Sequence, residues 1–270
     1  MSEPDPWLVS PGKRARLADV DPDATVGAPG NKQKTIEATE KSLARLSELH
    51  DRMWAQRSDS LLLVLQGMDT SGKDGTISHV ARGLNPQGTR VVAFKQPSEE
   101  ELSHDYLWRV HKEMPAVGEL CVFNRSHYED VLIVRVHNLV PEDRWHRRYE
   151  QINAFEEMAS QEGTTVVKCF LHISRDEQAR RLRARLEDPT KRWKFKMGDL
   201  AERARWDDYL AAYEDALTRT STDWAPWHII SADHKWYRNY AISKILVDSL
   251  ERLHPEYPQP EDIPDGVVIA

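Results

Sequence analysis

The sequence predicts an α/β protein whose parallel sheet is covered by helices on both faces. Five short apolar runs, typical of buried strands, recur along the chain, and helical patterns separate them. Strands that alternate with helices form parallel sheets, because each connecting helix crosses one face of the sheet. The first run also leads directly into a glycine-rich loop, which places a candidate anion site at one edge of that sheet.

The predicted elements follow in chain order from these patterns. The strands are expected at 61–65, 90–94, 119–123, 165–173 and 227–230. Apolar residues at helical spacing predict a helix over 32–56, and another follows the glycine-rich loop. Capping residues indicate three more helices: 102–112 after Ser98 and Glu101, 142–162 after Pro141, and one from Arg175 after Ser174. A last helix is expected over 202–218.

Length and composition fit a single enzyme domain. The chain has 270 residues, of which 40% are hydrophobic and 30% charged. Mean hydropathy is −0.66, and no apolar run approaches the roughly 20 residues that span a bilayer. The first residues lack a signal peptide's apolar segment, so we expect a cytoplasmic protein with no membrane partner. Cys121 and Cys169 lie in apolar runs and are expected to be buried thiols.

The glycine-rich loop reads Gly67-x-x-x-x-Gly72-Lys73, the pattern of a phosphate-binding loop. Its glycines let backbone N–H groups turn toward an anion, and the next helix adds its partial positive charge. Lys73 supplies a mobile ammonium group for a phosphoryl group in transfer. Asp74 replaces the usual hydroxyl ligand of Mg²⁺, while Asp69 lies inside the loop. The alternative, a glycine-rich turn that contains a lysine by chance, is disfavoured because strand, loop and helix agree.

A second polar cluster follows the strand expected at 119–123. In P-loop enzymes this strand commonly ends in an acid that holds Mg²⁺. Here the end is Asn124, so the acid would be Glu129 or Asp130, and Arg125 could bridge a transferring phosphoryl group. The alternative interpretation is helix capping by Asn124 or Ser126 together with an Arg–carboxylate pair, and the two interpretations are compatible.

Charge is distributed unevenly along the chain. The net charge of −7 argues against a general nucleic-acid partner. Residues 175–205 nevertheless hold eleven Lys/Arg against six Asp/Glu, which indicates a strongly anionic local partner or a solvated helix face with ion pairs. Within this segment, cations alternate with Trp193 and Phe195, as in a mobile lid over phosphates or in an edge strand. These cations are Lys191, Arg192, Lys194 and Lys196.

Four motifs together resemble polyphosphate kinase family 2, and the likeness covers roughly residues 21–260. The motifs are GMDTSGKDGT, NRSHYEDV, KRWKFKMGDLAERARWDDY and TSTDWAPWHIISADHKWYRN. The Asn-Arg-Ser-His-Tyr-Glu-Asp version resembles the third class of the family, where other classes carry Asp-Arg-Ser-Trp-Tyr-Asn. That class is associated with phosphorylation of both nucleoside monophosphates and diphosphates.

The resemblance implies a three-layer α/β/α P-loop kinase core with a parallel sheet and a helical lid. The core would span 32–270 with the lid at about 188–218, after an irregular arm at 1–31. The implied activity is reversible phosphoryl transfer from inorganic polyphosphate to AMP and ADP, with guanine nucleotides as further acceptors. Mg²⁺ is the implied cofactor, Mn²⁺ its substitute, and a homo-oligomer the expected assembly. The rivals are an ATP-dependent nucleoside monophosphate kinase and a non-catalytic polyphosphate- or nucleotide-binding protein, and the latter would lack Lys73 or Arg125.

The resemblance also assigns roles to individual residues. The catalytic groups would be Asp69, Lys73 and Arg125, with Glu129 at the position that separates the classes. Mg²⁺ would be held by Asp69, with Glu129 or Asp130 as a further ligand, since the Asp-to-Asn change at the strand end removes one expected ligand. Apart from the resemblance, we expect His127 to pack in the interior or to support the site residues, and not to be a phosphohistidine. Nucleotide and phosphate contacts are expected from Gly67, Thr70, Ser71, Gly72, Asp74, Gly75, Asn124 and Glu129, and polyphosphate contacts in the lid from Lys191, Arg192, Lys194, Lys196 and Arg203.

Overall fold

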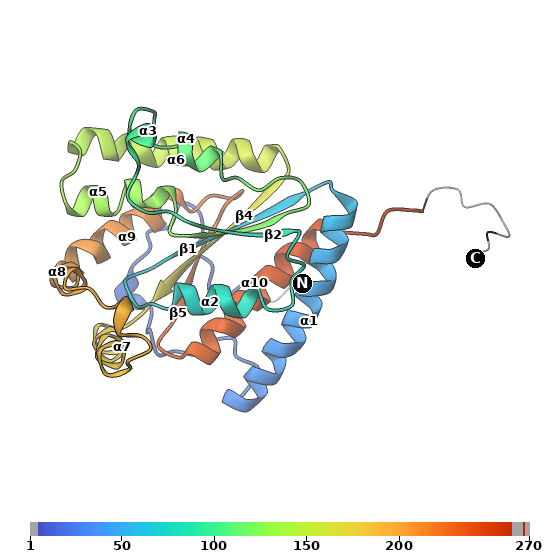
Figure 1. Ribbon diagram of the computed structural model, residues 1–270, viewed down its shortest axis with the longest axis horizontal. Helices are drawn as coiled ribbons and strands as arrows, with labels where there is room; N and C mark the ends of the chain where they lie inside the picture. Colours follow the sequence, from blue (N-terminus) through green and yellow to red (C-terminus); the bar gives the residue numbers. More distant parts are fainter. Residues whose placement is uncertain (1–4, 261–266, 268–270) are drawn as a thin grey trace.

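The computed structural model describes residues 5–260 and Val267. These residues form one five-stranded sheet of order β2-β3-β1-β4-β5, and every pair of neighbours is parallel (Figure 1). The strands are β1 (Ser60–Gln66), β2 (Thr89–Ala93), β3 (Leu120–Asn124), β4 (Thr164–His172) and β5 (Trp227–Ser231). Each lies within one residue of its predicted range, so the parallel α/β prediction is confirmed.

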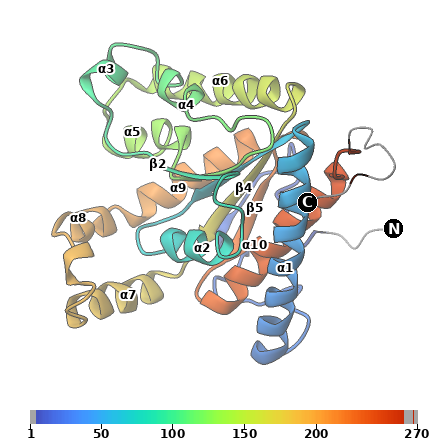
Figure 2. The ribbon, with the colours of Figure 1, turned by 45° about the vertical axis from the view of Figure 1, so that its right-hand side comes forward.

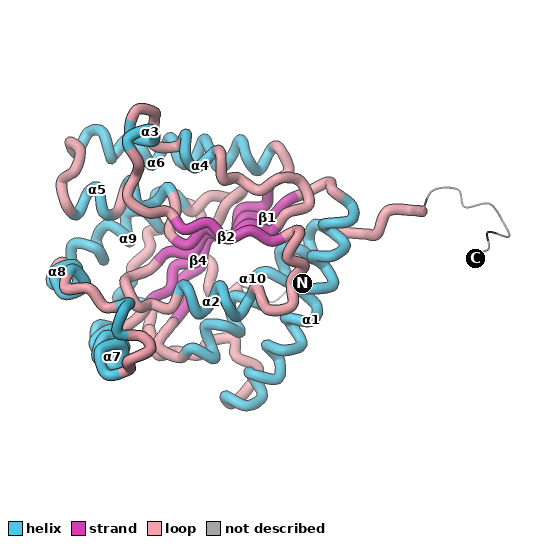
Figure 3. The backbone as a smooth tube through the Cα atoms, in the orientation of Figure 1, coloured by secondary structure: helices cyan, strands magenta, loops and turns pink. Residues whose placement is uncertain are grey.

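Helices cover both faces of the sheet, which confirms the three layers (Figure 3). Successive residues of β1 point to opposite faces and join different apolar clusters. Leu61, Leu63 and Leu65 pack in the cluster that includes α1 and α10. Leu62 and Val64 pack in the other cluster, which includes α6 and α9. One face therefore carries α1 (Lys32–Gln56), α2 (Lys73–Val80) and α10 (Lys235–Leu253), and the other carries α5 (Ile133–Val136), α6 (Glu142–Gln161) and α9 (Trp206–Thr220).

Three helices begin where the sequence predicts, α1 from its apolar spacing and the other two from the residues before them. The side chain of Asn31 accepts a hydrogen bond from the backbone of Lys34 at the start of α1. Pro141 precedes α6, and Ser174 caps α7 (Arg175–Glu187) by accepting from the backbone of Glu177. The sequence therefore places these three helix starts correctly.

The predicted helix over 102–112 is wrong. The capping box of Ser98 and Glu101 forms, but it opens only the short α3 (Glu99–Leu102), and α4 (Trp108–His111) follows after a break. Asp105 causes the break, because its Oδ1 accepts hydrogen bonds from the backbone N–H groups of Leu107 and Trp108 over 2.9 and 3.1 Å. A side chain that binds nearby backbone in this way competes with helix formation.

The segment that precedes α9 also differs from the prediction. Residues 188–197 form turns and a short 3₁₀ helix, η3 (Arg192–Lys194), so the edge-strand alternative is wrong. The expected helix over 202–218 is two helices, α8 (Gly198–Ala204) and α9, which meet at Arg205. Trp193 in this segment is 75% exposed, whereas Trp206 at the start of α9 is buried in the core. The boundaries of a lid at 188–218 stay a prediction.

Residues 5–31 are irregular apart from η1 (Leu17–Asp19), and they pack against the sheet. Trp7 and Leu17 are buried, and Leu8 forms an antiparallel bridge with His228 of β5. Residues 1–4 of the predicted arm, and 261–266 and 268–270 of the predicted domain, lie outside the described residues. Within the described part of the chain, no helix has the length and apolar character needed to cross a bilayer. Cys121 and Cys169 are free and buried, as predicted.

Candidate active site

The glycine-rich loop joins the end of β1 to the start of α2 at the carboxyl edge of the sheet. Gly67 and Gly72 have φ of 150° and 107°, in the left-handed region that favours glycine. A Cβ atom at Gly67 would lie 2.8 Å from the carbonyl oxygen of Leu171, so a side chain is excluded there. Thr70 is also left-handed, with φ of 64°. This strand–loop–helix geometry is that of a phosphate-binding loop.

Lys73 folds back over this loop. Its Nζ donates hydrogen bonds to the carbonyl oxygens of Gly67 and Met68 over 2.6 and 3.3 Å. Burial, and then the positive charge of Arg125, lower the pKa of Lys73 to about 8. An anion bound in the loop would raise that pKa again, so the ammonium group is poised for a phosphate.

Arg125 joins the end of β3 to the loop. Its Nη2 donates to Oδ1 of Asp69 over 2.8 Å, and its backbone N–H donates to the carbonyl oxygen of Leu65 over 3.1 Å. The backbone of Arg125 is left-handed, with φ of 63°, a conformation that costs energy in a non-glycine residue. The structure thus brings Asp69 and Arg125 into direct contact, with Lys73 on the same loop.

Of the two acids predicted as further metal ligands, only Glu129 faces the loop. Burial raises the pKa of Glu129, and the charges of Arg125 and Lys73 oppose this shift. The side-chain amide of Gln66 lies between Glu129 and Ser126. In the orientation that gives both its nitrogen and its oxygen a partner, the nitrogen donates to Oε1 of Glu129 over 3.1 Å. Asp130 instead accepts from Nη1 of Arg148 over 2.9 Å. This geometry favours Glu129 over Asp130 as a partner of Asp69.

The polar residues around Arg125 also hold the backbone in place. Nδ2 of Asn124 donates to Oδ1 of Asp74 over 2.9 Å, which links the end of β3 to the first turn of α2. Oγ of Ser126 accepts from the backbone of Tyr128 at the start of η2 (His127–Asp130). The capping interpretation is therefore correct for Ser126, and the structure also contains the predicted Arg–carboxylate pair.

A cavity of about 250 Å³ opens beside the loop. Its polar wall carries Asp69, Arg125 and Glu129, and three aromatic residues of α9 form another wall. These are Trp206, Tyr209 and Tyr213, which sequence reasoning missed because their helical spacing is that of ordinary core residues. A larger cavity of about 690 Å³ lies between α5, α6 and α9, but no residue of the glycine-rich loop lines it. The smaller cavity is the better candidate because the phosphate loop opens into it.

Two of the predicted lid cations approach the site. Lys196 lines the cavity, and Nζ of Lys194 lies 3.8 Å from Oδ2 of Asp74. The others are engaged elsewhere. Lys191 forms an ion pair with Asp188, and Arg192 donates to the carbonyl oxygen of Leu186. Arg203 donates to the carbonyl oxygen of Arg175 and to Oε1 of Gln178. The role of these cations in polyphosphate binding stays a prediction.

Two residues that sequence reasoning missed fasten the loop to α7. Nη1 of Arg181 donates to the carbonyl oxygens of Thr70 and Ser71 over 2.9 Å. Gln178, one turn earlier, donates to the carbonyl oxygen of Asp69 over 3.0 Å. In the sequence these residues are merely part of a charged helix, so nothing there indicates that α7 contacts the loop.

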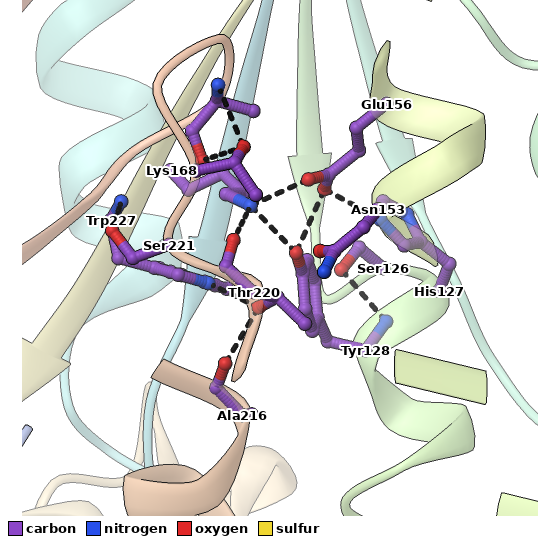
Figure 4. Close-up of polar contacts among 12 residues, drawn as sticks. Ser126, His127, Tyr128, Asn153, Glu156, Lys168, Ala216, Thr220, Ser221 and Trp227 are labelled. Atoms are coloured by element: carbon purple, nitrogen blue, oxygen red, sulfur yellow. Dashed lines mark hydrogen bonds and ion pairs between the residues drawn. The ribbon is translucent and has the colours of Figure 1, made fainter. Parts of the chain in front are cut away.

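A buried polar network includes His127 and Tyr128, two residues of the turn between Arg125 and Glu129 (Figure 4). Oε1 of Glu156 accepts from the hydroxyl of Tyr128 over 2.8 Å and lies 3.0 Å from Nε2 of His127. Its Oε2 pairs with Nζ of Lys168, which also donates to the carbonyl oxygen of Thr220 over 2.7 Å. His127 is therefore a buried packing residue, as expected. Because every charge in the network is paired, the network can hold this turn rigidly.

The oxygen atoms at the loop suit a hard divalent cation. Asp69 and Glu129 contribute carboxylates to one cavity, and the hydroxyls of Thr70 and Ser71 are buried without a hydrogen-bond partner. The described residues contain no cluster of three or more His, Cys, Asp or Glu side chains suited to a metal. Mg²⁺ commonly binds through one or two carboxylates plus substrate phosphates and water, so the residues present fit it.

Comparisons with known proteins agree with this geometry. The family model of Polyphosphate kinase 2 matches residues 30–258. An AMP/ADP-polyphosphate phosphotransferase of Meiothermus ruber is 52% identical over 97% of this chain and 98% of its own. An ADP-polyphosphate phosphotransferase of Rhodopseudomonas palustris is 43% identical over 85% of this chain and 83% of its own.

Solved structures are similar as well. The crystal structure of Polyphosphate Kinase 2 from Arthrobacter aurescens TC1 has a TM-score of 0.90 and 46% identity, over 96% of both chains. A structure from Pseudomonas aeruginosa, described as a polyphosphate kinase 2, has a TM-score of 0.83 and 33% identity over 88% of this chain and 50% of its own. With the phosphate loop, the Asp69–Arg125 pair and these matches over nearly the whole chain, the protein belongs to the polyphosphate kinase 2 family.

Proposed function

We propose that this protein transfers phosphoryl groups from inorganic polyphosphate to AMP and to ADP, in a reversible, Mg²⁺-dependent reaction. The observation that carries the proposal is the likeness to the AMP/ADP-polyphosphate phosphotransferase of M. ruber, which extends over nearly the full length of both chains. A polyphosphate:AMP phosphotransferase of Pseudomonas syringae, 37% identical over 77% of this chain, supports use of the monophosphate.

The chain's own residues can perform such a transfer by positioning and charge neutralisation. Phosphoryl transfer passes through a loose transition state whose charge spreads over the phosphoryl oxygens. The N–H groups of the loop and the start of α2 would bind these oxygens, and Lys73 would follow the moving group. Arg125 would bridge donor and acceptor oxygens, with Asp69 fixing the position of its guanidinium group.

Asp69 and Glu129 would hold the Mg²⁺ ion in the cavity, and Mn²⁺ would substitute for it. When bound, the metal would supply positive charge that neutralises part of the charge of the phosphates. Glu129 also stands at the position that the family resemblance connects with acceptor choice. Its partly buried carboxylate is close enough to the loop to influence whether a monophosphate is accepted.

The aromatic wall of the cavity would take the acceptor. Trp206, Tyr209 and Tyr213 offer apolar faces to a nucleobase, whereas Lys196 offers a cation to its phosphates. Flat aromatic faces do not select one purine over another, so we extend the proposal to guanine nucleotides. The cytoplasmic location and the homo-oligomeric state stay predictions.

The main rival is an ATP-dependent nucleoside monophosphate kinase, which also combines a phosphate loop with a lid. The test incubates the purified protein with Mg²⁺, long-chain polyphosphate and AMP, and separates the nucleotides over time. We expect ADP to appear first and ATP second, without added ATP. If AMP is phosphorylated only when ATP is supplied, the rival is correct.

A further inference from the structure

Lys168 is fully buried in β4, with apolar residues on both sides of it in the strand. A buried ammonium group is costly unless its charge is paired and its N–H groups are bonded. Its Nζ donates to Oε2 of Glu156 over 2.5 Å, to the carbonyl oxygen of Thr220 over 2.7 Å and to the hydroxyl of Tyr128 over 2.8 Å. One buried group therefore joins three residues that are far apart in the sequence.

The three partners of Lys168 belong to different elements (Figure 4). Tyr128 belongs to η2, Glu156 to α6 and Thr220 to α9. Two of these elements also form walls of the cavity that opens at the phosphate loop, since η2 carries Glu129 and α9 carries the aromatic wall. Neither Lys168 nor Glu156 is among the described residues that line this cavity, so the pair acts on it only through these elements.

The contacts with η2 form a closed ring of hydrogen bonds. The hydroxyl of Tyr128 accepts from Lys168 and donates to Oε1 of Glu156, and Lys168 pairs with Glu156. Nε2 of His127 also lies 3.0 Å from Oε1. These four side chains are at most 1% exposed, so bulk water does not compete for their bonds. Because Glu129 directly follows Tyr128, the position of this ring determines where the Glu129 backbone lies in the cavity wall.

The contact with α9 lies at the end of this helix, where carbonyl groups lack partners within the helix. The positive charge of Lys168 beside the carbonyl oxygen of Thr220 also suits the negative end of the helix dipole. On the same face of the sheet, α9 packs against α5 and α6 (Figure 2), and Nδ2 of Asn153 in α6 donates to the carbonyl oxygen of Arg219 over 2.9 Å. Two consecutive carbonyl groups are thus held, about two turns from Tyr213 of the aromatic wall.

Stability alone does not account for this buried ion pair. The cost of removing two charges from water roughly cancels their attraction, and well-packed apolar side chains of similar volume often give an equally stable protein. Apolar side chains would not, however, form directional bonds to two separate segments. The Glu156–Lys168 pair therefore supplies fixed geometry more than it supplies free energy of folding.

We propose that Glu156 and Lys168 are positioning residues for the acceptor nucleotide, because they hold η2 and α9 at one fixed separation across the cavity. The inference rests on the proposed function and adds to it two residues that touch no substrate. Without the pair the two walls can shift, so the nucleotide should bind less tightly and lie in line with the donor less often. Polyphosphate has no base for the aromatic wall to contact, so its binding should change little.

The test is Lys168→Met combined with Glu156→Gln, which leaves no unpaired charge in the interior. With ADP and long-chain polyphosphate, we expect KM for ADP to rise about fivefold and kcat to fall at least about tenfold, since small misplacements of reacting groups are costly. KM for polyphosphate should stay within about twofold of the wild type, because the phosphate loop and its cations are unchanged. Glu156→Gln alone keeps an oxygen that can accept from Tyr128, so it should show the same split on a smaller scale.

Leu46→Ala is the matched control, because Leu46 is fully buried in α1 on the other face of the sheet. It should lower the melting temperature by leaving a cavity, with kcat and both KM values unchanged. The positioning role is overturned if the folded double variant keeps the wild-type kcat and KM for ADP, if both KM values rise equally, or if the control shows the same split. If the double variant does not fold, Glu156→Gln is judged by the same criteria.

Failure of the proposed function is a separate outcome. In that case the wild type uses no polyphosphate, and calorimetric binding of ADP to the wild type and to the variant decides the positioning role. Weaker binding by the variant supports the role, and equal binding overturns it.

Discussion

Nη2 of Arg125 lies 2.8 Å from Oδ1 of Asp69, and this ion pair connects the end of β3 to the phosphate loop. The backbone of Arg125 is left-handed, and so is that of Thr70, the residue after Asp69. The pair is only partly exposed, at 41% and 29% of the two side chains. The pair contributes little to stability because it is partly exposed, and its main effect is to fix the positions of the two side chains at the loop.

Asp69→Asn tests the proposed metal ligand. An amide is a weaker ligand than a carboxylate and also loses its ion pair with Arg125, so we expect a lower kcat and a higher Mg²⁺ requirement. Titration of activity with Mg²⁺ measures both effects. An unchanged Mg²⁺ requirement would show that Asp69 serves only to position Arg125.

Glu129→Asn tests the control of acceptor choice. The partly buried carboxylate lines the cavity with Arg125, and its removal should change the ratio of kcat/KM for AMP to that for ADP. Asp130→Asn is the matched control, because its carboxylate pairs with Arg148 away from the cavity. If both variants leave the ratio as it is, acceptor choice is determined elsewhere.

The candidate site residues that could be predicted from the sequence lie in short contiguous motifs or directly after a predicted strand. Asp69 and Lys73 lie within one contiguous motif, and Arg125 follows a strand end directly. Arg181 and Arg238 could not be found in this way, because their contacts with the loop join segments about 110 and 170 residues apart and arise only from tertiary packing. The broken helix around Asp105 shows the same limit, since the two hydrogen bonds accepted by one side chain outweighed a favourable helical pattern.

The pH dependence should report the buried lysine. Lys73 must be charged to bind phosphate, and its pKa is lowered to about 8. We therefore expect kcat/KM, which reflects the free enzyme, to fall as pH rises through about 8. A bound phosphate raises this pKa, so the fall in kcat should occur at higher pH. In Lys73→Arg, whose side chain stays charged, the fall near this pH should disappear, and its persistence would assign it to another group.

Lys194→Ala combined with Lys196→Ala tests the lid. We expect KM for polyphosphate to rise more than KM for ADP, and the effect to weaken with added salt, because the contacts are electrostatic. Lys191→Ala serves as the control, since this exposed lysine pairs with Asp188 within the same segment. If only KM for ADP rises, these residues form a nucleotide lid.

The most direct test of the central claim is the rate of ATP formation from ADP and long-chain polyphosphate by Lys73→Ala and by Arg125→Ala. Each change removes a charge that would stabilise the transferring phosphoryl group, so the rate should fall at least about a hundredfold while thermal melting shows a folded protein. A rate within about tenfold of the wild type in either folded variant would contradict the account, because the loss of one such contact normally exceeds that factor.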